Sequence, residues 1–440
     1  MCGMNRLQLN CRVIKSGGRI TGLLAFSLGI ILLLGPACRK AIRIPPGIRL
    51  DTAGAPLVRV RLVNGASKVS LGGNPTGVLL TDAASGEKIA SIPSGQDWDA
   101  VLFGPQGQLR VSMPDGRVSR PHPEGIRVEA LGDSKTIEIN GSLYRGTAAV
   151  HAVGAGGGGL MVINTLPLEE YLVSVVPAEI GQLDLSRIEA LKAQAVASRS
   201  FAMSRMVRNR QFAFDLTADT GDQVYKGKSS ENPVARQAIL ETFGECLTRR
   251  AEVITAFYHS CCGGRTAEPE EVWGARFADE TPYLKSVKDG DYDRHSKWSS
   301  WTVKWSRRQL LDQLKKTLPG QLGLSASEIG EPTDIEIVRK GPSGRSTLLK
   351  VSTDKRIFQI SGDRIRRVLC QPDGKILPST WFDLSMKRER SEAVIIAEGR
   401  GNGHGLGLCQ WGATARAANG HSYRKILKHY YKGIGIARMY

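Results

Sequence analysis

The sequence lacks the cysteine spacings that define two common classes of small domain. No two cysteines are arranged as Cys-x-x-Cys, so a structural zinc ribbon is not predicted. The five cysteines beyond residue 38 are odd in number and widely spaced, which indicates no disulfide framework. Because 41% of the residues are hydrophobic and 23% are charged, the composition also excludes a largely disordered chain and a membrane protein with many spans.

The first 40 residues contain no aspartate or glutamate, which indicates an export signal. Four basic residues precede an apolar run from Ile20 to Leu34, as in a secretory signal peptide. This run is short for a membrane span, which needs about 20 apolar residues. The small residues that lead to Cys38 resemble a lipoprotein processing site. We therefore predict a signal peptide or membrane anchor over residues 1–37 and export across the cytoplasmic membrane. The exported protein would be held at the membrane or associated with the cell wall, and lipidation of Cys38 is left open.

The chain carries an excess of positive charge. It has 60 Lys and Arg residues against 42 Asp and Glu residues, and a formal net charge of +18. Such a charge favours an acidic partner: nucleic acid, anionic lipid or an anionic polymer. Export argues against nucleic acid, because DNA is not the usual anion outside the membrane. Charge and location together favour an anionic cell-wall polymer.

The part of the chain after the signal begins with a predicted linker and continues as strands. Turn-forming residues such as Pro45-Pro46-Gly47 predict a linker over residues 38–56. From Leu57, apolar and basic residues alternate with period two, and short strand-like runs follow. Asn140-Gly141 is a hairpin signal among them. We predict a small all-β module over residues 57–150.

The remaining sequence, residues 151–440, predicts helices as well as strands. Ser186 and Glu189 fit a capping box at the start of an Ala-rich helix that ends near Met206. The small side chains of this helix predict close packing at the centre of the fold. A second helix is predicted from Gln410 to Ala418. The predicted fold class is therefore α+β, with an N-terminal all-β module and an α+β core around the central Ala-rich helix.

A glutamate among apolar residues is the first candidate for chemistry. Glu179 ends an apolar stretch and lies between Ala178 and Ile180. Apolar surroundings disfavour a charged carboxyl and raise its pKa, which suits a group that protonates a leaving oxygen near neutral pH. A surface glutamate near a helix end is the plainer interpretation of this segment taken alone.

Two further segments carry charged or nucleophilic side chains. Lys192 and Arg199 lie seven residues apart on one face of the Ala-rich helix, where they could hold an anion or belong to a solvated face. His259 and Cys261 alternate on a predicted strand and therefore point to the same side. This pair leaves open a thiol nucleophile, a metal site or a purely structural role.

Alternating glycines over residues 399–407 form the last candidate segment. No Gly-Lys-Ser or Gly-Lys-Thr follows, so a phosphate-binding loop is not favoured. The pattern predicts either backbone that comes close to a ligand or tight packing that tolerates no side chain. In the first case His404 and Trp411 would line a cleft, with the tryptophan as a platform for a sugar ring.

Together these segments resemble the stage II sporulation protein D / amidase enhancer LytB (SpoIID/LytB) family. The motifs occur in the family's order across about residues 144–300 and 395–435, and residues 300–390 match only loosely as an insertion. The matching residues are Pro167–Leu172, Val175–Glu179, Glu189–Arg199, Asp222–Gly227, Tyr258–Thr266, Val272-Trp273, Pro282–Leu284, Gly401–Ala413 and Tyr430–Gly433.

The resemblance implies an exported protein that acts on peptidoglycan. Sporulation members of the family are lytic transglycosylases that cut glycan strands whose stem peptides have been removed, and the glutamate of their Val-Pro-x-Glu motif corresponds to Glu179. Such an enzyme needs one carboxyl where a hydrolytic glycosidase usually needs two. The resulting reaction is a carbon–oxygen lyase step that leaves a 1,6-anhydro-N-acetylmuramic acid end. The residues that we predict to bind substrate are Tyr171, Lys192, Arg199, Tyr225, His404, Gln410 and Trp411.

Two other functions are left open by the sequence. The first is a non-catalytic peptidoglycan-binding protein that enhances an N-acetylmuramoyl-alanine amidase. The second, a hydrolase that uses Cys261 and His259, lacks an identifiable third residue to orient the histidine. The predicted chemistry requires no cofactor. Some family members bind a metal near the His-containing Gly-Gly-x-Thr segment, which leaves open a structural or accessory zinc ion whose ligands we do not assign. The expected partners are peptidoglycan strands, an amidase and the membrane, without nucleic acid.

Overall fold

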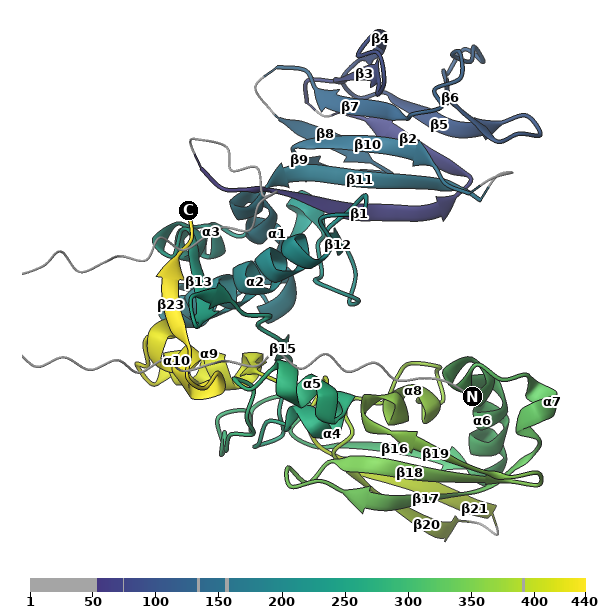
Figure 1. Cartoon of the computed structure of the whole chain (residues 1–440), viewed down its shortest axis with the longest axis vertical. Helices are drawn as coiled ribbons and strands as arrows, with labels where there is room; N and C mark the ends of the chain where they lie inside the picture. Colours follow the sequence, from purple (N-terminus) through teal and green to yellow (C-terminus); the bar gives the residue numbers. More distant parts are fainter. Residues whose placement is uncertain (1–53, 74, 133–134, 155–157, 390–391) are drawn as a thin grey trace, which may run out of the picture. The chain divides into compact units, whose positions relative to one another are not determined.

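The computed structural model describes residues 54–440, except 74, 133–134, 155–157 and 390–391. The predicted signal or anchor over residues 1–37, Cys38 and most of the predicted linker lie outside the described residues. Within the described part of the chain, no helix is long and apolar enough to cross a membrane. Helices and sheets are both present and the N-terminal region is all β, which confirms the predicted α+β fold (Figure 1).

The N-terminal region consists of two sheets that share one hydrophobic core. Val58 and Val60 are fully buried while Arg59 and Arg61 are not, so the period-two pattern does form a strand. The hairpin predicted at Asn140-Gly141 is present. The first sheet has the strand order β12-β1-β11-β10-β7-β3-β4, and the second has the order β6-β5-β2-β8-β9. The strands are β1 (Leu57–Ala66), β2 (Lys68–Gly72), β3 (Val78–Asp82), β4 (Lys88–Ile92), β5 (Asp97–Phe103), β6 (Gln108–Ser112), β7 (Ile126–Ala130), β8 (Thr136–Ile139), β9 (Ser142–Arg145), β10 (Thr147–Ala152), β11 (Leu160–Pro167) and β12 (Leu216–Thr217).

The first sheet extends beyond residue 150, where we predicted the β module to end. That residue lies inside β10, and β11 pairs antiparallel with both β1 and β10. β12, which follows the Ala-rich helix in sequence, pairs parallel with β1. Pro167 ends β11 and Leu168 begins the first helix, so the sheet leads directly into the helical core.

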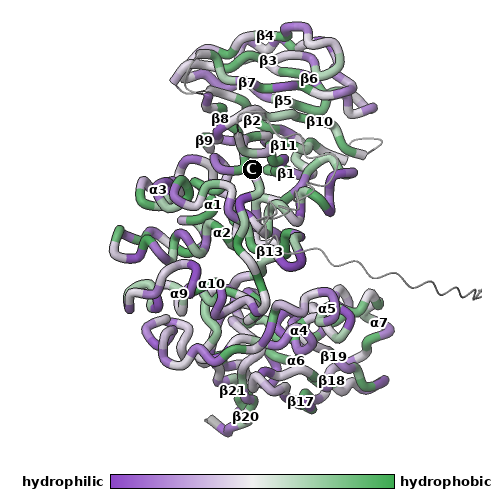
Figure 2. The backbone as a smooth tube through the Cα atoms, turned by 60° about the vertical axis from the view of Figure 1, so that its left-hand side comes forward, coloured by the Kyte–Doolittle hydropathy of each residue, from purple (hydrophilic) through white to green (hydrophobic). Residues whose placement is uncertain are grey.

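The helical core is arranged around α2, the predicted Ala-rich helix (Figures 1 and 2). Its alanines are buried, which lets α1, α3, α9 and α10 approach closely. The capping box predicted at Ser186 was wrong: Ser186 lies in a 3-10 turn, where its backbone N–H donates to Asp184. The elements of this core are α1 (Leu168–Ile180), η1 (Leu185–Arg187), α2 (Ile188–Arg208), η2 (Gly227–Ser230), α3 (Pro233–Glu241), β13 (Glu245–Arg249), β14 (Glu252–Val253), β15 (Tyr258–His259), α4 (Pro269–Trp273), α5 (Ala275–Glu280), β22 (Leu408–Cys409), α9 (Gln410–Ala418), α10 (Tyr423–Tyr430) and β23 (Gly435–Arg438).

The segment from 300 to 390, together with strand β21 that follows it, has a hydrophobic core of its own. This region contains two three-stranded sheets, β16-β21-β20 and β17-β18-β19. β16 pairs with β21 so that Trp301 lies opposite Gly399, and the region therefore begins and ends side by side. Its elements are β16 (Trp301–Ser306), α6 (Arg307–Leu322), α7 (Ala326–Ile329), β17 (Pro332–Lys340), β18 (Ser346–Thr353), β19 (Ile357–Ser361), η3 (Gly362–Arg364), α8 (Ile365–Val368), β20 (Phe382–Glu389) and β21 (Glu392–Gly399).

A buried ion pair joins α1 to α2. The guanidinium of Arg199 is fully buried and donates two hydrogen bonds to the carboxylate of Glu169, at 2.8 and 2.7 Å. A third donor of Arg199 reaches the backbone oxygen of Glu245 at 3.0 Å. The hydroxyl of Tyr440 also donates to Glu169. Because α1 carries Glu179, this pair sets the position of the candidate acid.

The Arg199→Met variant should lower the free energy of unfolding by about 3–5 kcal/mol, because it leaves the carboxylate of Glu169 buried without a counter-charge. Urea denaturation at pH 7 measures the change. Arg276→Met is the matched control, since Arg276 forms only an exposed pair with Glu280 and its loss should hardly move the midpoint. Equal losses in the two variants would contradict the structural role of the buried pair.

Candidate active site

Glu179 lies in the last turn of α1, where the helix ends at Gly181. The backbone of Gly181 has φ = 96° and its N–H donates to the carbonyl of Pro177, so the chain turns away directly after the glutamate. The Glu179 side chain is half-buried. Its Oε1 atom accepts a hydrogen bond of 2.7 Å from the backbone N–H of Val224. The carboxyl is therefore directed into the protein rather than toward open solvent.

Two opposing effects act on this carboxyl. Burial raises the pKa of Glu179 above its usual range, because the charged form loses part of its hydration. The backbone N–H of Val224 and, after it, the side chains of Tyr258 and Gln410 act in the opposite direction by stabilising the carboxylate. The Glu179 carboxyl therefore keeps its proton to a higher pH than an exposed glutamate does. Its anion is still stabilised by these neighbours after the proton is lost. This combination suits a side chain that acts first as an acid and then as a base.

A short parallel strand pair brings the neighbours of Glu179 together. β15 pairs with β22 so that Tyr258 lies opposite Leu408. Gln410 follows β22 directly as the first residue of α9. Gln223 donates to the hydroxyl of Tyr258 at 2.9 Å and accepts a hydrogen bond of 3.1 Å from Tyr171. We did not predict roles for Tyr258, Gln223 or the N–H of Val224, although all three residues lie inside motifs that the sequence singled out.

Four of the predicted substrate-binding residues have partners inside the protein. Tyr171 is fully buried in the network described above, and the buried hydroxyl of Tyr225 donates to Asn164 at 2.8 Å. Arg199 belongs to the buried ion pair with Glu169. Lys192 bridges two surface glutamates at 2.7 Å each, and its side chain is only 15% exposed. Their contact with substrate stays a prediction, and the contacts visible in the structure join neighbouring elements of the core.

The three other predicted residues come from the C-terminal glycine segment and its helix. Gln410 acts on Glu179 directly, and Trp411 beside it is 38% exposed. The ring of His404 lies 5.2 Å from that of Trp273, and its Nδ1 accepts a hydrogen bond from the backbone N–H of Leu406. Burial lowers the pKa of His404 to about 4, so its imidazole is neutral at neutral pH.

The alternating glycines fit tight packing within the protein. A Cβ atom at Gly403 would lie 2.7 Å from the Cβ of His259, and one at Gly407 would overlap the carbonyl oxygen of Phe257. Both glycines also have positive φ angles, of 104° and 67°. The sequence left open whether these glycines allow close approach to a ligand or tight packing. The geometry supports tight packing, because the backbone comes close to the protein's own residues.

Three buried side chains near this segment form a group that fits a zinc ion. A ring nitrogen of His259 and the sulfur atoms of Cys262 and Cys409 lie within 4.8 Å of one another. The Nδ1 of His259 is bonded to the backbone oxygen of Leu406 at 3.0 Å, while its buried Nε2 has no hydrogen-bond partner among the described residues. Nitrogen and sulfur are the ligand atoms that zinc prefers, and a carbonyl that orients the histidine is a frequent companion.

A second group, which joins the same two cysteines to Asp289 and Asp293, fits a metal less well. Asp289 is held by Arg416 and by the hydroxyl of Tyr430, and Asp293 accepts the N–H groups of Gly263 and Gly264. These contacts already satisfy both carboxylates.

Cys261 has the wrong surroundings for a nucleophile. Burial raises the pKa of its thiol, and Sγ donates to Asp293 at 3.2 Å. Since the thiolate is the reactive form, a cysteine that keeps its proton argues against the Cys261 and His259 hydrolase.

Comparison with known proteins places the site in a matched region of the chain. The family model described as stage II sporulation protein matches residues 156–248, which include Glu179 and Val224. A second model, described as a domain of unknown function (DUF8618), matches residues 284–407 and covers the segment from 300 to 390.

Three relatives cover longer stretches. An uncharacterized protein of Brachyspira hyodysenteriae is 33% identical over 278 residues, which are 63% of this chain and 68% of the relative. Stage II sporulation protein D of Bacillus amyloliquefaciens is 32% identical over 292 residues, which are 62% of this chain and 75% of the relative. The amidase enhancer of Bacillus subtilis is 28% identical over 287 residues, which are 56% of this chain but only 37% of that protein.

The raised pKa of Glu179 predicts a pH-dependent effect of Glu179→Gln on stability. Because the folded-state pKa lies above the unfolded one, wild type keeps its full stability at low pH and loses part of it as the pH rises through the folded-state pKa. Glutamine mimics the protonated form and avoids that loss. The variant should therefore gain stability relative to wild type from pH 4 to pH 7 in urea titrations.

The control for this experiment is Glu280→Gln, which removes the same charge from an exposed position. Its difference from wild type should stay nearly flat over the same pH range. A gain for Glu179→Gln that is no larger than the control's would show that burial does not disfavour the Glu179 carboxylate.

Proposed function

Because the chain belongs to the stage II sporulation protein D family, which has a cell-wall-related role, we propose that it is a peptidoglycan lytic transglycosylase. Its substrate in this proposal is glycan whose stem peptides have been removed. Glu179 is the only residue to which we give a proton-transfer role. The same proposal includes export of the protein. It also includes attachment to the membrane through the N-terminal anchor or a lipid on Cys38.

The observation that carries the proposal is the environment of Glu179. Burial raises its pKa while the Val224 N–H, Tyr258 and Gln410 stabilise its anion. The acid nearest to Val224 in sequence, Asp222, is already engaged by Arg205 at 3.0 Å and by the N–H of Thr217. A mechanism with two free carboxylates therefore has less support than one with a single carboxyl.

The proposed reaction returns the enzyme to its starting state. Glu179 gives its proton to the glycosidic oxygen between N-acetylmuramic acid and N-acetylglucosamine as the C1–O bond breaks. The resulting carboxylate then takes the proton of the C6 hydroxyl of the same muramic residue while O6 bonds to C1. The products are a 1,6-anhydro end and a free sugar hydroxyl, no water is consumed, and Glu179 is protonated again.

A non-catalytic role as an amidase enhancer is the second candidate. It is favoured by the similarity to the amidase enhancer of Bacillus subtilis, although the match covers little of that protein. In this case the chain would bind glycan and stimulate an N-acetylmuramoyl-alanine amidase, and Glu179 would have no chemical step to perform. The two functions therefore differ in what the Glu179→Gln substitution does.

Glu179→Gln should lower the release of anhydro-muramic products from peptide-free glycan by about 10²–10⁴-fold, because it removes the transferable proton and keeps the shape of the side chain. Mass spectrometry of the digest measures these products, and wild-type products formed in ¹⁸O-water should contain no solvent oxygen at C1. Glu280→Gln should behave as wild type.

Two results would overturn the proposed chemistry. One is wild-type product labelled at C1, which would indicate hydrolysis. The other is an inactive wild type that stimulates an amidase equally well with and without Glu179→Gln, which would favour the enhancer role.

We also propose that His259, Cys262 and Cys409 hold a structural zinc ion. The buried Nε2 of His259, without a partner among the described residues, is the feature that supports it. An ion in this place would connect β15 to β22 and so support Tyr258 and Gln410, without taking part in proton transfer.

The purified full chain should contain about one zinc ion, since zinc is also retained by three protein ligands in sites that keep the fourth position for water. Cys262→Ser should lower the zinc content measured by mass spectrometry of the metal, and it should lower the melting temperature. Cys370→Ser, which changes a buried cysteine of the segment from 300 to 390, should leave the zinc content unchanged. Zinc-free wild type, or equal zinc in both variants, would refute the site.

A further inference from the structure

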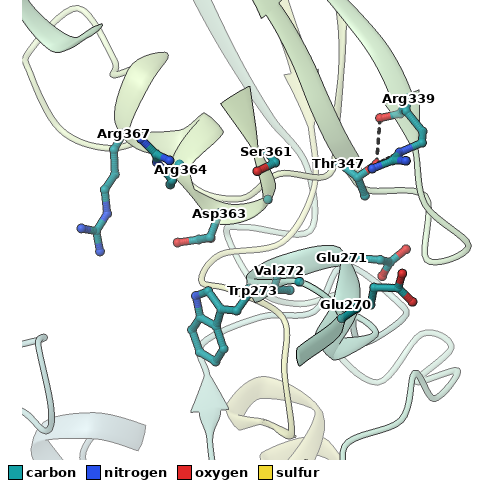
Figure 3. A pocket seen from close by; sticks show the side chains of 13 residues that line it. Glu270, Glu271, Val272, Trp273, Arg339, Thr347, Ser361, Asp363, Arg364 and Arg367 are labelled. Carbon is teal, nitrogen blue, oxygen red and sulfur yellow. Dashed lines mark hydrogen bonds between the residues drawn. The ribbon is translucent and has the colours of Figure 1, made fainter. Parts of the chain in front are cut away.

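A pocket of about 530 Å³ lies where helix α4 faces the segment from 300 to 390 (Figure 3). This volume is within the range of ligand sites in proteins. The pocket has two different ends. Trp273, Arg364 and Arg367 gather at one end, whereas Glu270 and Glu271 lie at the other (Figure 3). None of these residues is part of the candidate acid's immediate surroundings.

Trp273 is held firmly but keeps part of its surface open. Its indole packs against Phe277 at 4.7 Å, Phe257 at 5.0 Å and His404 at 5.2 Å between ring centroids. Even so, 41% of the residue is exposed. A large aromatic ring that is fixed before binding offers apolar surface at little cost in conformational entropy. Its open side is therefore suited to the flat apolar face of a sugar ring.

The guanidinium groups of the two arginines at this end have no partner in the described part of the chain. Arg364 and Arg367 are exposed, and neither side chain forms an ion pair or hydrogen bond among the described residues. Asp363 also lines this end of the pocket (Figure 3), but its carboxylate is paired with Arg366 at 3.0 Å. At the far end, Glu271 accepts the N–H groups of Glu268 and Ser343. The end near Trp273 is therefore positive and can accept a carboxylate, which arginine binds through two parallel hydrogen bonds.

A series of side-chain contacts connects this end of the pocket to the surroundings of the candidate acid. Trp273 packs on Phe257, the residue that precedes Tyr258, and the Tyr258 side chain acts on the Glu179 carboxyl. His404 contacts Trp273 from the same glycine segment that leads to Gln410. These contacts make a neighbouring unit of a polymer bound at Glu179 a suitable occupant of the pocket.

We propose that Trp273, Arg364 and Arg367 form a subsite for a carboxylate-bearing sugar, which in a peptide-free glycan strand is a muramic acid unit away from the cleaved bond. The indole stacks on the sugar ring and the two arginines bind the lactyl carboxylate. The assignment rests on the proposed function for its choice of polymer. It gives the segment from 300 to 390 a role in recognising the strand, since both arginines belong to that segment.

Binding to the full chain carrying Glu179→Gln tests the subsite without turnover. The probes are peptide-free glycan strands and chitooligosaccharides of similar length, which lack the carboxylates. The double variant Arg364→Gln/Arg367→Gln should weaken glycan binding by about tenfold in calorimetry and leave chitooligosaccharide binding nearly unchanged. Trp273→Ala should weaken both, because stacking does not depend on the carboxylate.

The matched control is Arg308→Gln/Arg388→Gln, which removes two charges from exposed positions of the same segment outside the pocket. If it weakens glycan binding as much as the pocket variant, general charge attraction explains the effect and the subsite is refuted. Unchanged glycan binding in the pocket variant also refutes it. The exposed arginines can be replaced without disturbing the core, so this result stands even if Trp273→Ala fails to fold.

The two proposals fail in different ways. If wild type cuts no glycan but the pocket variant still loses carboxylate-dependent binding, the transglycosylase is wrong and the subsite stands. If wild type releases anhydro products and the pocket variant binds both probes as its parent does, the subsite is wrong and the catalytic proposal stands.

Discussion

Ionising Glu179 costs free energy because its carboxyl is partly removed from water, and the neighbouring groups limit that cost. In open solvent the same carboxyl would lose its proton well below neutral pH. Buried without donors, it would have no means to stabilise its anion. Glu179 is intermediate between these two cases, because the N–H of Val224 and the side chains of Tyr258 and Gln410 stabilise its anion. In the proposed mechanism, their balance with burial allows one side chain to give and to recover a proton.

This balance depends on contacts between segments that are far apart in sequence. The pair of Glu169 with Arg199 fixes α1, which carries the acid, against α2. The parallel pairing of β15 with β22 brings together Tyr258 and Gln410, the two side chains that stabilise the Glu179 carboxylate. The glycines of the C-terminal segment permit this pairing because side chains at Gly403 or Gly407 would collide with the β15 region. Much of the unusual sequence around the site therefore serves its geometry rather than contact with a ligand.

Local sequence patterns predicted local structure, but they did not identify the hydrogen-bond and ion-pair partners of buried polar groups. Helix α9 has the predicted bounds, since Asn419-Gly420 offers a clear stop. The predicted capping box at Ser186 did not form, because Asp184 accepts the N–H of Ser186 in a 3-10 turn that precedes α2. The sequence identified Glu179 from its apolar neighbours, but the contact with Val224 joins residues 45 positions apart, and no pattern specifies a backbone donor at that distance. For the same reason, a buried arginine such as Arg199 cannot be distinguished by residue type from one that binds substrate.

The proposed subsite on the segment from 300 to 390 would add recognition of a polymer to a fixed acid. This segment leaves and re-enters the core through the paired strands β16 and β21, next to the glycine segment that leads to Gln410. Its hydrophobic core contains none of the residues that pack around α1 and α2. Changes on its surface, including those at Arg364 and Arg367, can therefore alter what binds beside Trp273 while the surroundings of Glu179 stay the same. If both proposals hold, the separate cores allow strand selection and proton transfer to vary independently, although side-chain contacts connect the two sites.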